Sequence, residues 1–167
     1  HQPGDLDDMA ISSKQQLPTR EKQLIGKYAA AMINDGDRVI IDSGTTTMEI
    51  AKNLDAFKDL TIITNALDIA ITLNNYGRFT VIVLGGTMRT VSHSTVGMIS
   101  EYALKNIFCD KLFLGVDSIS IKDGLSTPSL EEASLNQAMI GAAKEVVAVF
   151  DSSKFGRRTF AHIASHL

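Results

Sequence analysis

The sequence predicts an α/β fold in which helices cover both faces of a mostly parallel β-sheet. Two observations support this prediction. First, short apolar runs typical of strands alternate along the chain with segments whose apolar residues recur at helical spacing. Second, the strand-like runs are continuously apolar, which is typical of strands buried on both faces. Together they predict a three-layer, Rossmann-like domain, and 167 residues are enough for one such domain with its own core.

Composition and charge narrow the class of protein. Hydrophobic residues make up 44% of the chain and charged residues 21%, so the chain is not of the disordered class. The formal net charge of -3 gives the chain no general attraction for nucleic acid. The single cysteine, Cys109, excludes an internal disulfide and indicates a reducing, cytoplasmic location. No apolar run approaches the roughly 18 residues needed to cross a bilayer, so we expect no membrane partner.

The first helix is expected after a polar leader. Residues 1–18 are interpreted as a leader or linker, followed by one domain over residues 19–167. The helix is predicted to begin near Thr19 and to end before Gly36, a residue suited to a left-handed cap. Its apolar stripe recurs every 3 or 4 residues and consists of Leu24, Ile25, Tyr28, Ala29, Met32 and Ile33. Because the first residue is His1, we expect a fragment of a longer chain.

The chain is organised around residues 39–49, which are predicted to form a strand, a tight polar loop and the start of a helix. The loop turns at Ser43-Gly44. Three hydroxyl side chains follow it: Thr45, Thr46 and Thr47. Backbone N–H groups and hydroxyls gathered at a helix start can donate hydrogen bonds to phosphate or sugar oxygens. The stretch has no lysine and no Walker spacing. The alternative is a turn that only leads into a helix cap.

Four more strands are predicted along the chain, at residues 60–64, 79–84, 111–115 and 145–151. Helices are expected over 67–73, after Gly97 to about 107, and from about Ser129 to 142. Residues 87–95 are polar and ambiguous. Lys122-Asp123-Gly124 predicts the turn of a small hairpin or lid within residues 119–126.

Polar residues or glycines stand where each predicted strand ends. They are Asp42, Asn65, Gly85-Gly86, Asp117 and Asp151. The carboxyl ends of parallel strands meet at one edge of a sheet, and ligands of such folds bind beyond that edge. The sequence therefore predicts a binding site at this rim.

Six short strings occur in order and at familiar spacing. They are Ile-Asp-Ser-Gly-Thr-Thr-Thr at 41–47, Ile-Thr-Asn-Ala-Leu at 63–67, Leu-Gly-Gly at 84–86 with Arg89, Phe-Leu-Gly-Val-Asp at 113–117, Gly-Leu-Ser-Thr at 124–127 with Glu132, and Asp-Ser-Ser-Lys-Phe-Gly at 151–156. Together they resemble the C-terminal effector-sensing domain of the DeoR family of bacterial transcriptional repressors, from about Thr19 to the end of the chain. Each string alone is weak, whereas six in order are specific.

The resemblance implies a fold related to pentose-phosphate isomerases and coenzyme-A transferases. It also implies a sensor of a phosphorylated sugar or related catabolite, whose binding would alter oligomerisation or DNA affinity. The implied partners are this effector and further copies of the chain, as a homodimer or homotetramer. Family members contact DNA through an N-terminal winged helix-turn-helix domain, which we expect to be missing here. They usually continue past the segment of Lys154 with a last apolar strand, so we expect the chain to stop early.

The residues with the clearest binding chemistry lie in the first loop and among the cations. We assign Ser43, Gly44 and the three threonines that follow to the phosphate or sugar hydroxyls of the effector. An ionised Asp42 would repel a phosphate, so we expect it to cap the loop or to accept a hydrogen bond from a sugar hydroxyl. Arg89 offers a planar fork suited to phosphate, with a solvated surface arginine as the alternative. Lys154 could pair with phosphate as a point charge, whereas Arg157 and Arg158 are expected to form a solvated surface patch.

Other candidate residues stay open between binding and structure. Asn65 can present its amide to the ligand or cap the following helix. Gly85 and Gly86 permit close backbone approach or only form a turn. Asp117 could accept a hydrogen bond from a sugar hydroxyl. Glu132 belongs to a capping-box pattern that begins at Ser129, and the family pattern also makes it a candidate sugar contact.

The alternative function is an aldose–ketose isomerase of a sugar phosphate, with Glu132 or Asp117 as base and Lys154 stabilising the enediolate. We expect a binding module without catalytic residues or cofactor instead, because the six strings resemble the sensors. His93 has serines on both sides but no acid to orient its ring, so a hydrolase is not indicated. His162 and His166 lack partners at metal-ligand spacing, and we expect no metal.

Overall fold

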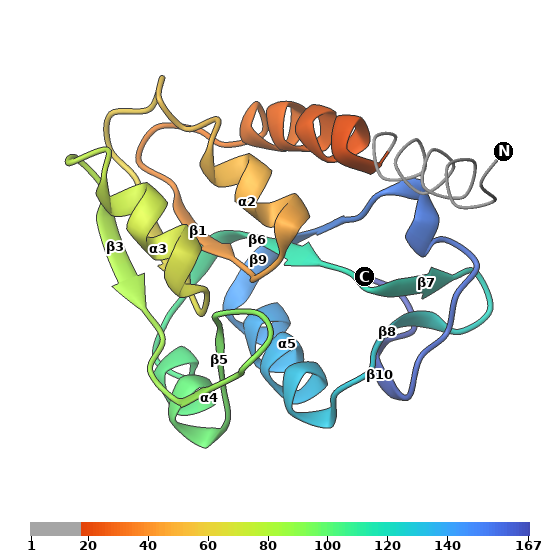
Figure 1. Cartoon of the computed structure of the whole chain (residues 1–167). Helices are drawn as coiled ribbons and strands as arrows, with labels where there is room; N and C mark the ends of the chain where they lie inside the picture. Colours follow the sequence, from red (N-terminus) through yellow and green to blue (C-terminus); the bar gives the residue numbers. More distant parts are fainter. Residues whose placement is uncertain (1–17) are drawn as a thin grey trace, which may run out of the picture.

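A computed structural model describes residues 18–167 of the chain, and the predicted leader therefore lies almost entirely outside the described residues. Its centre is a five-stranded sheet in the order β3-β2-β1-β6-β9, in which every neighbouring pair is parallel (Figure 1). The strands are β1 Arg38–Ile41, β2 Thr61–Thr64, β3 Thr80–Val83, β6 Cys109–Gly115 and β9 Ala143–Val149. The predicted parallel sheet is confirmed, with the expected strands in the expected places.

Helices cover both faces of the sheet, as predicted. A helix over residues 18–30, α2 (Thr45–Ala51) and α3 (Leu67–Asn74) pack on one face, and α4 (Met98–Leu104) and α5 (Leu130–Ala142) pack on the other. Strand β1 shows why its sequence is continuously apolar. Val39 and Ile41 join the core on the first face, and Ile40, between them, joins the core on the second. All three are fully buried, because successive side chains of a strand point to opposite faces.

Two small antiparallel sheets lie beside the central one (Figure 1). The predicted hairpin is confirmed as β7 (Ser118–Ser120) and β8 (Gly124–Thr127), and β10 (Ala161–Ala164) adds a third strand to it. Gly124 in its turn has a φ of +71°, which favours glycine. The ambiguous residues 87–95 contain a second hairpin, β4 (Thr87–Met88) and β5 (Thr95–Val96). After β9, residues Ser152–Lys154 form a short 3-10 helix, η1.

The predicted apolar stripe of the first helix is only partly correct. The helix buries Ala29 and Ala30, and Ile33 is buried beyond its end, whereas Leu24, Tyr28 and Met32 are exposed. The helix lies so close to α2 that small residues make the contact. Helix α4 likewise buries Ser100 and Leu104 and exposes the larger Ile99 and Tyr102.

Two predicted helix ends also need correction. Asn65 does not cap α3, because Ala66 occupies the N-cap position and makes no side-chain cap bond. The first helix ends at residue 30, six residues before Gly36. Gly36 has a φ of +85° but serves the turn that leads into β1. Within residues 18–167, no helix is both long and apolar enough to cross a membrane.

We predict that Gly26→Ala destabilises the protein, because an added Cβ would lie 2.6 Å from the carbonyl carbon and oxygen of Glu49 in α2. Overpacking of this kind costs about 1–3 kcal/mol, which would lower the melting temperature by several degrees. Gly141→Ala in α5 is the matched control, because its Cβ would meet no atom within 4 Å. It should leave the melting temperature unchanged or raise it, since alanine favours helix. Equal melting temperatures for the two variants would contradict the close helix contact.

Candidate functional site

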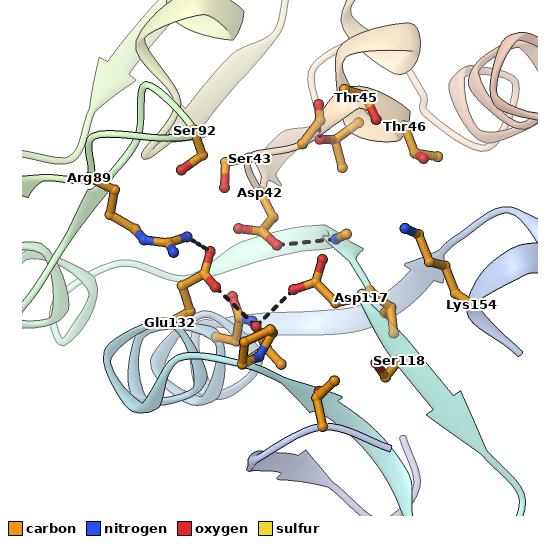
Figure 2. A pocket seen from close by; sticks show the side chains of 18 of the residues that line it. Asp42, Ser43, Thr45, Thr46, Arg89, Ser92, Asp117, Ser118, Glu132 and Lys154 are labelled. Carbon is orange, nitrogen blue, oxygen red and sulfur yellow. Dashed lines mark hydrogen bonds and ion pairs between the residues drawn. The ribbon is translucent and has the colours of Figure 1, made fainter. Parts of the chain in front are cut away.

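A pocket of about 390 Å³ opens beyond the carboxyl ends of β1 and β6 (Figure 2). Segments from all parts of the fold line it: residues 42–47, Arg89 and Ser92, residues 115–118, Thr127 and Pro128, Glu132 and Asn136, and Lys154, Arg157 and Thr159. The position agrees with the rule that ligands of parallel α/β sheets bind beyond the carboxyl ends of the strands.

The floor of the pocket is the turn that joins β1 to α2. The Asp42 N–H donates to the carbonyl of Phe113 at 3.0 Å, and its Oδ2 accepts from the N–H of Gly115 at 3.1 Å. A Cβ at Gly115 would lie 2.9 Å from the Ser43 carbonyl oxygen, so only glycine lets β6 approach the turn this closely. Gly44, with a φ of +138°, is the N-cap of α2, and no side chain caps that helix. The loop therefore presents backbone and hydroxyl groups to the pocket.

The three threonines of the loop have different roles. Thr47 is fully buried, and its hydroxyl donates to the carbonyl of Gly44 at 3.1 Å. This bond fixes the turn and occupies the hydroxyl proton. Thr45 and Thr46 reach the same pocket at the start of α2 (Figure 2). The loop side of the pocket therefore combines a structural threonine with two whose hydroxyls can serve a ligand.

Two carboxylates share one hydroxyl on the opposite wall. Thr127 Oγ1 lies 2.8 Å from Asp117 Oδ2 and 2.9 Å from Glu132 Oε2 (Figure 2). A threonine hydroxyl has a single proton and can donate to only one carboxylate at a time. The pair therefore retains capacity to accept a hydrogen bond from a ligand. Beside it, Ser118 Oγ is buried and has no hydrogen-bond partner among the described residues.

Arg89 and Lys154 lie on opposite sides of the pocket (Figure 2). Arg89, on the loop after β4, forms an ion pair with Glu132 at the start of α5. Lys154, at the end of η1, makes no ion pair within residues 18–167. Of these two cations, Lys154 is thus the one whose charge is available to a bound anion.

The conflict between the two interpretations of Glu132 is resolved by separating its backbone from its side chain. The N–H of Glu132 donates to the Ser129 hydroxyl at 3.3 Å, which is the first half of the capping box. The Glu132 carboxylate instead contacts Arg89 and Thr127. The backbone therefore starts the helix while the side chain belongs to the pocket.

Burial raises the pKa of Asp42 from its ordinary 3.8 to about 8. The nearby carboxylates of Glu132 and Asp117 raise it further, whereas backbone N–H groups of Ser43 and Gly115 oppose the shift. Asp42 is therefore largely protonated at neutral pH. A protonated carboxyl does not repel an anion, which removes the objection to a phosphate beside it.

Asp151 at the base of η1 shows the opposite shift. Burial raises its pKa, but hydrogen bonds from Ser153 and the charges of Lys154 and Lys22 outweigh burial, and the resulting pKa lies below the ordinary value. Its Oδ1 accepts from the Ser153 N–H at 2.9 Å, which caps η1. Asp151 thus holds the segment that carries Lys154 and is not a lining residue of the pocket.

The structure brings most of the predicted site residues together. Ten of them line the pocket: Asp42, Ser43, Gly44, Thr45, Thr46, Thr47, Arg89, Asp117, Glu132 and Lys154. Asn65, Gly85 and Gly86 do not. The Asn65 amide donates to the Thr95 carbonyl at 3.0 Å and holds β5. The Gly85 carbonyl accepts from the Ser100 hydroxyl, and a Cβ at Gly86 would collide with the Val96 carbonyl, 2.6 Å away. These three positions join β2 and β3 to the second hairpin.

Several lining residues were not assigned to the site from the sequence. Thr127 stands in one of the strings that carry the family resemblance, and Asn136 follows Glu132 by four residues on the same face of α5. Helical spacing could have indicated Asn136. Ser118 comes directly after a predicted site residue but carried no signal of its own. Arg157, predicted to lie on a solvated surface, is exposed and also lines the pocket.

The described residues contain no group of three or more His, Cys, Asp or Glu side chains placed to hold a metal ion. The pocket instead offers backbone N–H groups, hydroxyls, carboxylates and three cations, Arg89, Lys154 and Arg157. A ligand with an anionic group and several hydroxyls would match this set of partners.

The family model described as "DeoR C terminal sensor domain" matches residues 18–166. The chain belongs to this family. It is 39% identical over 148 residues to the putative aga operon transcriptional repressor of Escherichia coli O157:H7, covering 89% of the chain and 55% of that protein. It is 35% identical over 151 residues to the transcriptional repressor GlcR of Bacillus subtilis, covering 90% of the chain and 58% of that protein. The chain thus spans slightly more than half the length of these two relatives.

The fold is also similar to that of solved structures with distant sequences. Ribose 5-phosphate isomerase A of Neisseria gonorrhoeae superposes with a TM-score of 0.58 at 14% identity, over 84% of this chain and 55% of the isomerase chain. At this identity the likeness concerns the fold alone. It confirms the α/β architecture of the DeoR sensor domain.

The raised pKa of Asp42 predicts a stability that falls as pH rises. Between the unfolded pKa of 3.8 and the folded pKa of about 8, the folded state binds more protons than the unfolded state. The free energy of unfolding should therefore fall by up to about 1 kcal/mol per pH unit between pH 5 and 8. Asp42→Asn cannot ionise and should lack this fall, as measured by urea unfolding at several pH values. Asp55→Asn, at an exposed position, is the control that should follow the wild-type profile. Parallel profiles for wild type and Asp42→Asn would contradict the assignment.

Proposed function

We propose that this DeoR sensor domain binds a phosphorylated sugar or a closely related metabolite in the pocket beyond β1 and β6. Binding modulates the DNA affinity of the regulator to which the domain belongs. The observation that carries the proposal is the presence, within one pocket, of Lys154, which has no ion-pair partner among residues 18–167, and of two carboxylates, Asp117 and Glu132, that share a single hydroxyl proton. A sugar phosphate supplies an anion for the cation and several hydroxyl donors for the carboxylates.

The phosphate is placed at the loop side of the pocket. Ser43, Thr45 and Thr46 supply hydroxyls there, and Lys154 supplies a charge that no described carboxylate pairs with. Arg157 lines the same pocket and adds a second cation. Protonation of Asp42 keeps the floor of the pocket from repelling the anion. These features together favour an anionic group over a neutral one.

The sugar hydroxyls are placed at the opposite wall. Asp117 and Glu132 share the single proton of Thr127, so at least one of them lacks a donor from that residue. Ser118 Oγ, buried and unpaired among the described residues, offers a further partner. Buried polar groups without partners are costly, and ligand hydroxyls would satisfy them.

The names of the two relatives support a role in transcription. Both are repressors, and both extend beyond the part that this chain covers. We propose that DNA contact belongs to a part of the regulator outside this domain, that the regulator controls a pathway of sugar catabolism in the cytoplasm, and that the domain self-associates.

We propose binding without turnover, although the fold resembles an isomerase. An isomerase base must be free to take a proton from the substrate. The Glu132 carboxylate is already engaged by Arg89 and Thr127. An isomerase assay on the sugar phosphates that bind is the direct comparison. Turnover that Glu132→Gln abolishes would replace the sensor with an enzyme.

Phosphorylated sugars should raise the melting temperature of the domain much more than the matching free sugars. A ligand at about 100 times its dissociation constant adds ~2.7 kcal/mol to the free energy of unfolding. A thermal-shift screen of phosphorylated pentoses and hexoses against their free forms measures this difference. Lys154→Gln should abolish most of the shift, whereas Arg158→Gln, outside the pocket lining, should keep it. Equal shifts by phosphorylated and free sugars would refute the anion site.

Asp117→Asn should distinguish the proposed hydroxyl-binding side of the pocket from the proposed phosphate-binding side. We expect it to weaken binding of the best sugar phosphate by about 10- to 100-fold, because hydrogen bonds to a charged group contribute about 1.5–3 kcal/mol. The affinity for inorganic phosphate should stay the same or rise, because the variant removes a negative charge from the pocket. Calorimetric titration with both ligands tests this. Equal loss of affinity for both would contradict the placement of the hydroxyls at Asp117.

A further inference from the structure

Strand β3 forms one edge of the central sheet and pairs only with β2 among the described strands. Some of its backbone N–H and C=O groups point toward β2, and the others point away from it. The Thr80 N–H donates to the Leu60 carbonyl at 3.0 Å, and the Leu84 N–H donates to the Thr64 carbonyl at 2.9 Å. Because these groups alternate along a strand, the N–H and C=O groups of Val81 and Val83 point away from β2, to the open edge.

This edge lacks the features that normally protect an edge strand. Thr80–Val83 contains no charged residue and no proline. The strand at the other edge of the sheet, β9, carries exposed Lys144 and Glu145. Charged residues and prolines prevent an edge from pairing with another chain, so their absence leaves β3 open to such pairing.

Exposed apolar side chains lie on both sides of the β3 edge. On one face, Val83 (45% exposed) lies beside Ile71 of α3 (63% exposed), and both line a shallow apolar hollow. On the other face lie Ile82 (40% exposed) and Ile99 of α4 (70% exposed). Ile99 reaches the end of the strand, because its Cγ2 lies 3.9 Å from an ideal Cβ at Gly85. Figure 1 shows α3, β3 and α4 along the same side of the molecule.

We propose that this edge binds the β3 edge of a second copy of the chain, antiparallel and about a two-fold axis, to form one continuous ten-stranded sheet. The inference rests on the self-association included in the proposed function and names the surface that performs it. An isologous contact requires a self-complementary surface, and an open strand edge is one. Val81 then exchanges hydrogen bonds with Val83 of the second copy, and Ile82 faces its own counterpart across the axis.

The apolar area fits a dimer interface. The exposed side chains along this side are Ile71, Ile82, Val83, Met98, Ile99 and Tyr102. Their exposed surface amounts to on the order of 700 Å² in total. Each partner in a stable interface buries about 800 Å² of accessible surface, which is a similar area. Helix α3 has one acid, Asp68, in its first turn, and α4 has Glu101, whose carboxylate accepts a hydrogen bond from Ser134 of α5. Lys105, which follows α4, lies over the Tyr102 ring. Strand β3 itself carries no charge, so a second copy meets a strip of apolar side chains and main-chain groups along the strand.

The register is tested with Ile82→Cys. Two copies of this residue would face each other at a non-hydrogen-bonded site, where the Cα atoms lie about 4.5 Å apart and a disulfide fits. Under mild oxidation the cross-linked dimer should form on the order of tenfold faster than in Ile121→Cys, because a held pair reacts at a high effective concentration. Ile121 is the matched control, since it is 92% exposed in the β7–β8 turn. The native Cys109 is buried and adds little background.

The assembly is tested by light scattering on the 167-residue chain. Val83→Lys should halve the wild-type mass, because it places a charge at the centre of the strip, whereas Ile121→Lys should leave the mass unchanged. The inference is overturned if wild type is monomeric, if Val83→Lys keeps the wild-type mass, or if Ile82→Cys cross-links no faster than Ile121→Cys.

Ligand thermal shifts measured on Val83→Lys separate the two proposals. A retained shift with half the wild-type mass supports both proposals, whereas a shift that is absent from wild type and variant alike, with the mass still halved, would count against the effector site alone.

Discussion

The site depends on the close parallel contact between β1 and β6. Their apolar side chains fill the core on both faces of the sheet, which fixes the two strands side by side and in register. The carboxyl ends must then meet, and Gly115 lets the β6 backbone reach the turn at Ser43. The bond from the Gly115 N–H to the Asp42 carboxyl joins the two ends. Hydrophobic packing thus positions polar groups that have little packing energy of their own.

Charge balance explains how three acids can line a pocket that is proposed to bind an anion. Asp42 gives up its charge because it is buried, and Glu132 is neutralised by Arg89. Asp117 remains beside Thr127, on the wall assigned to hydroxyl groups. In the proposed complex, the acids therefore act as acceptors for ligand hydroxyls and do not repel the phosphate. Lys154 then supplies the net attraction.

The sequence allowed the sheet, the hairpin and most of the pocket to be predicted, because continuous apolar runs identify parallel strands and parallel strands bring their ends together. The sequence-based prediction was wrong at Asn65, Gly85 and Gly86, which do not line the pocket. Nothing in the local sequence indicates that a later hairpin covers the ends of β2 and β3. It also misplaced the exposed faces of the helices. Small residues such as Gly26 and Ala29 decide how closely helices pack, and a pattern based on large apolar residues overlooks them.

The same hairpin offers a physical connection between the pocket and the open sheet edge. The chain runs from Val83 in β3 through two glycines into β4 and reaches Arg89 within six residues. Arg89 lines the pocket and forms an ion pair there with Glu132 of α5. The Asn65 amide donates a hydrogen bond to the Thr95 carbonyl, and the Ser100 hydroxyl donates one to the Gly85 carbonyl. These bonds hold the hairpin to β2, to the end of β3 and to α4. The proposed effector pocket and the proposed dimer edge are therefore joined by one short segment of chain that hydrogen bonds hold in place.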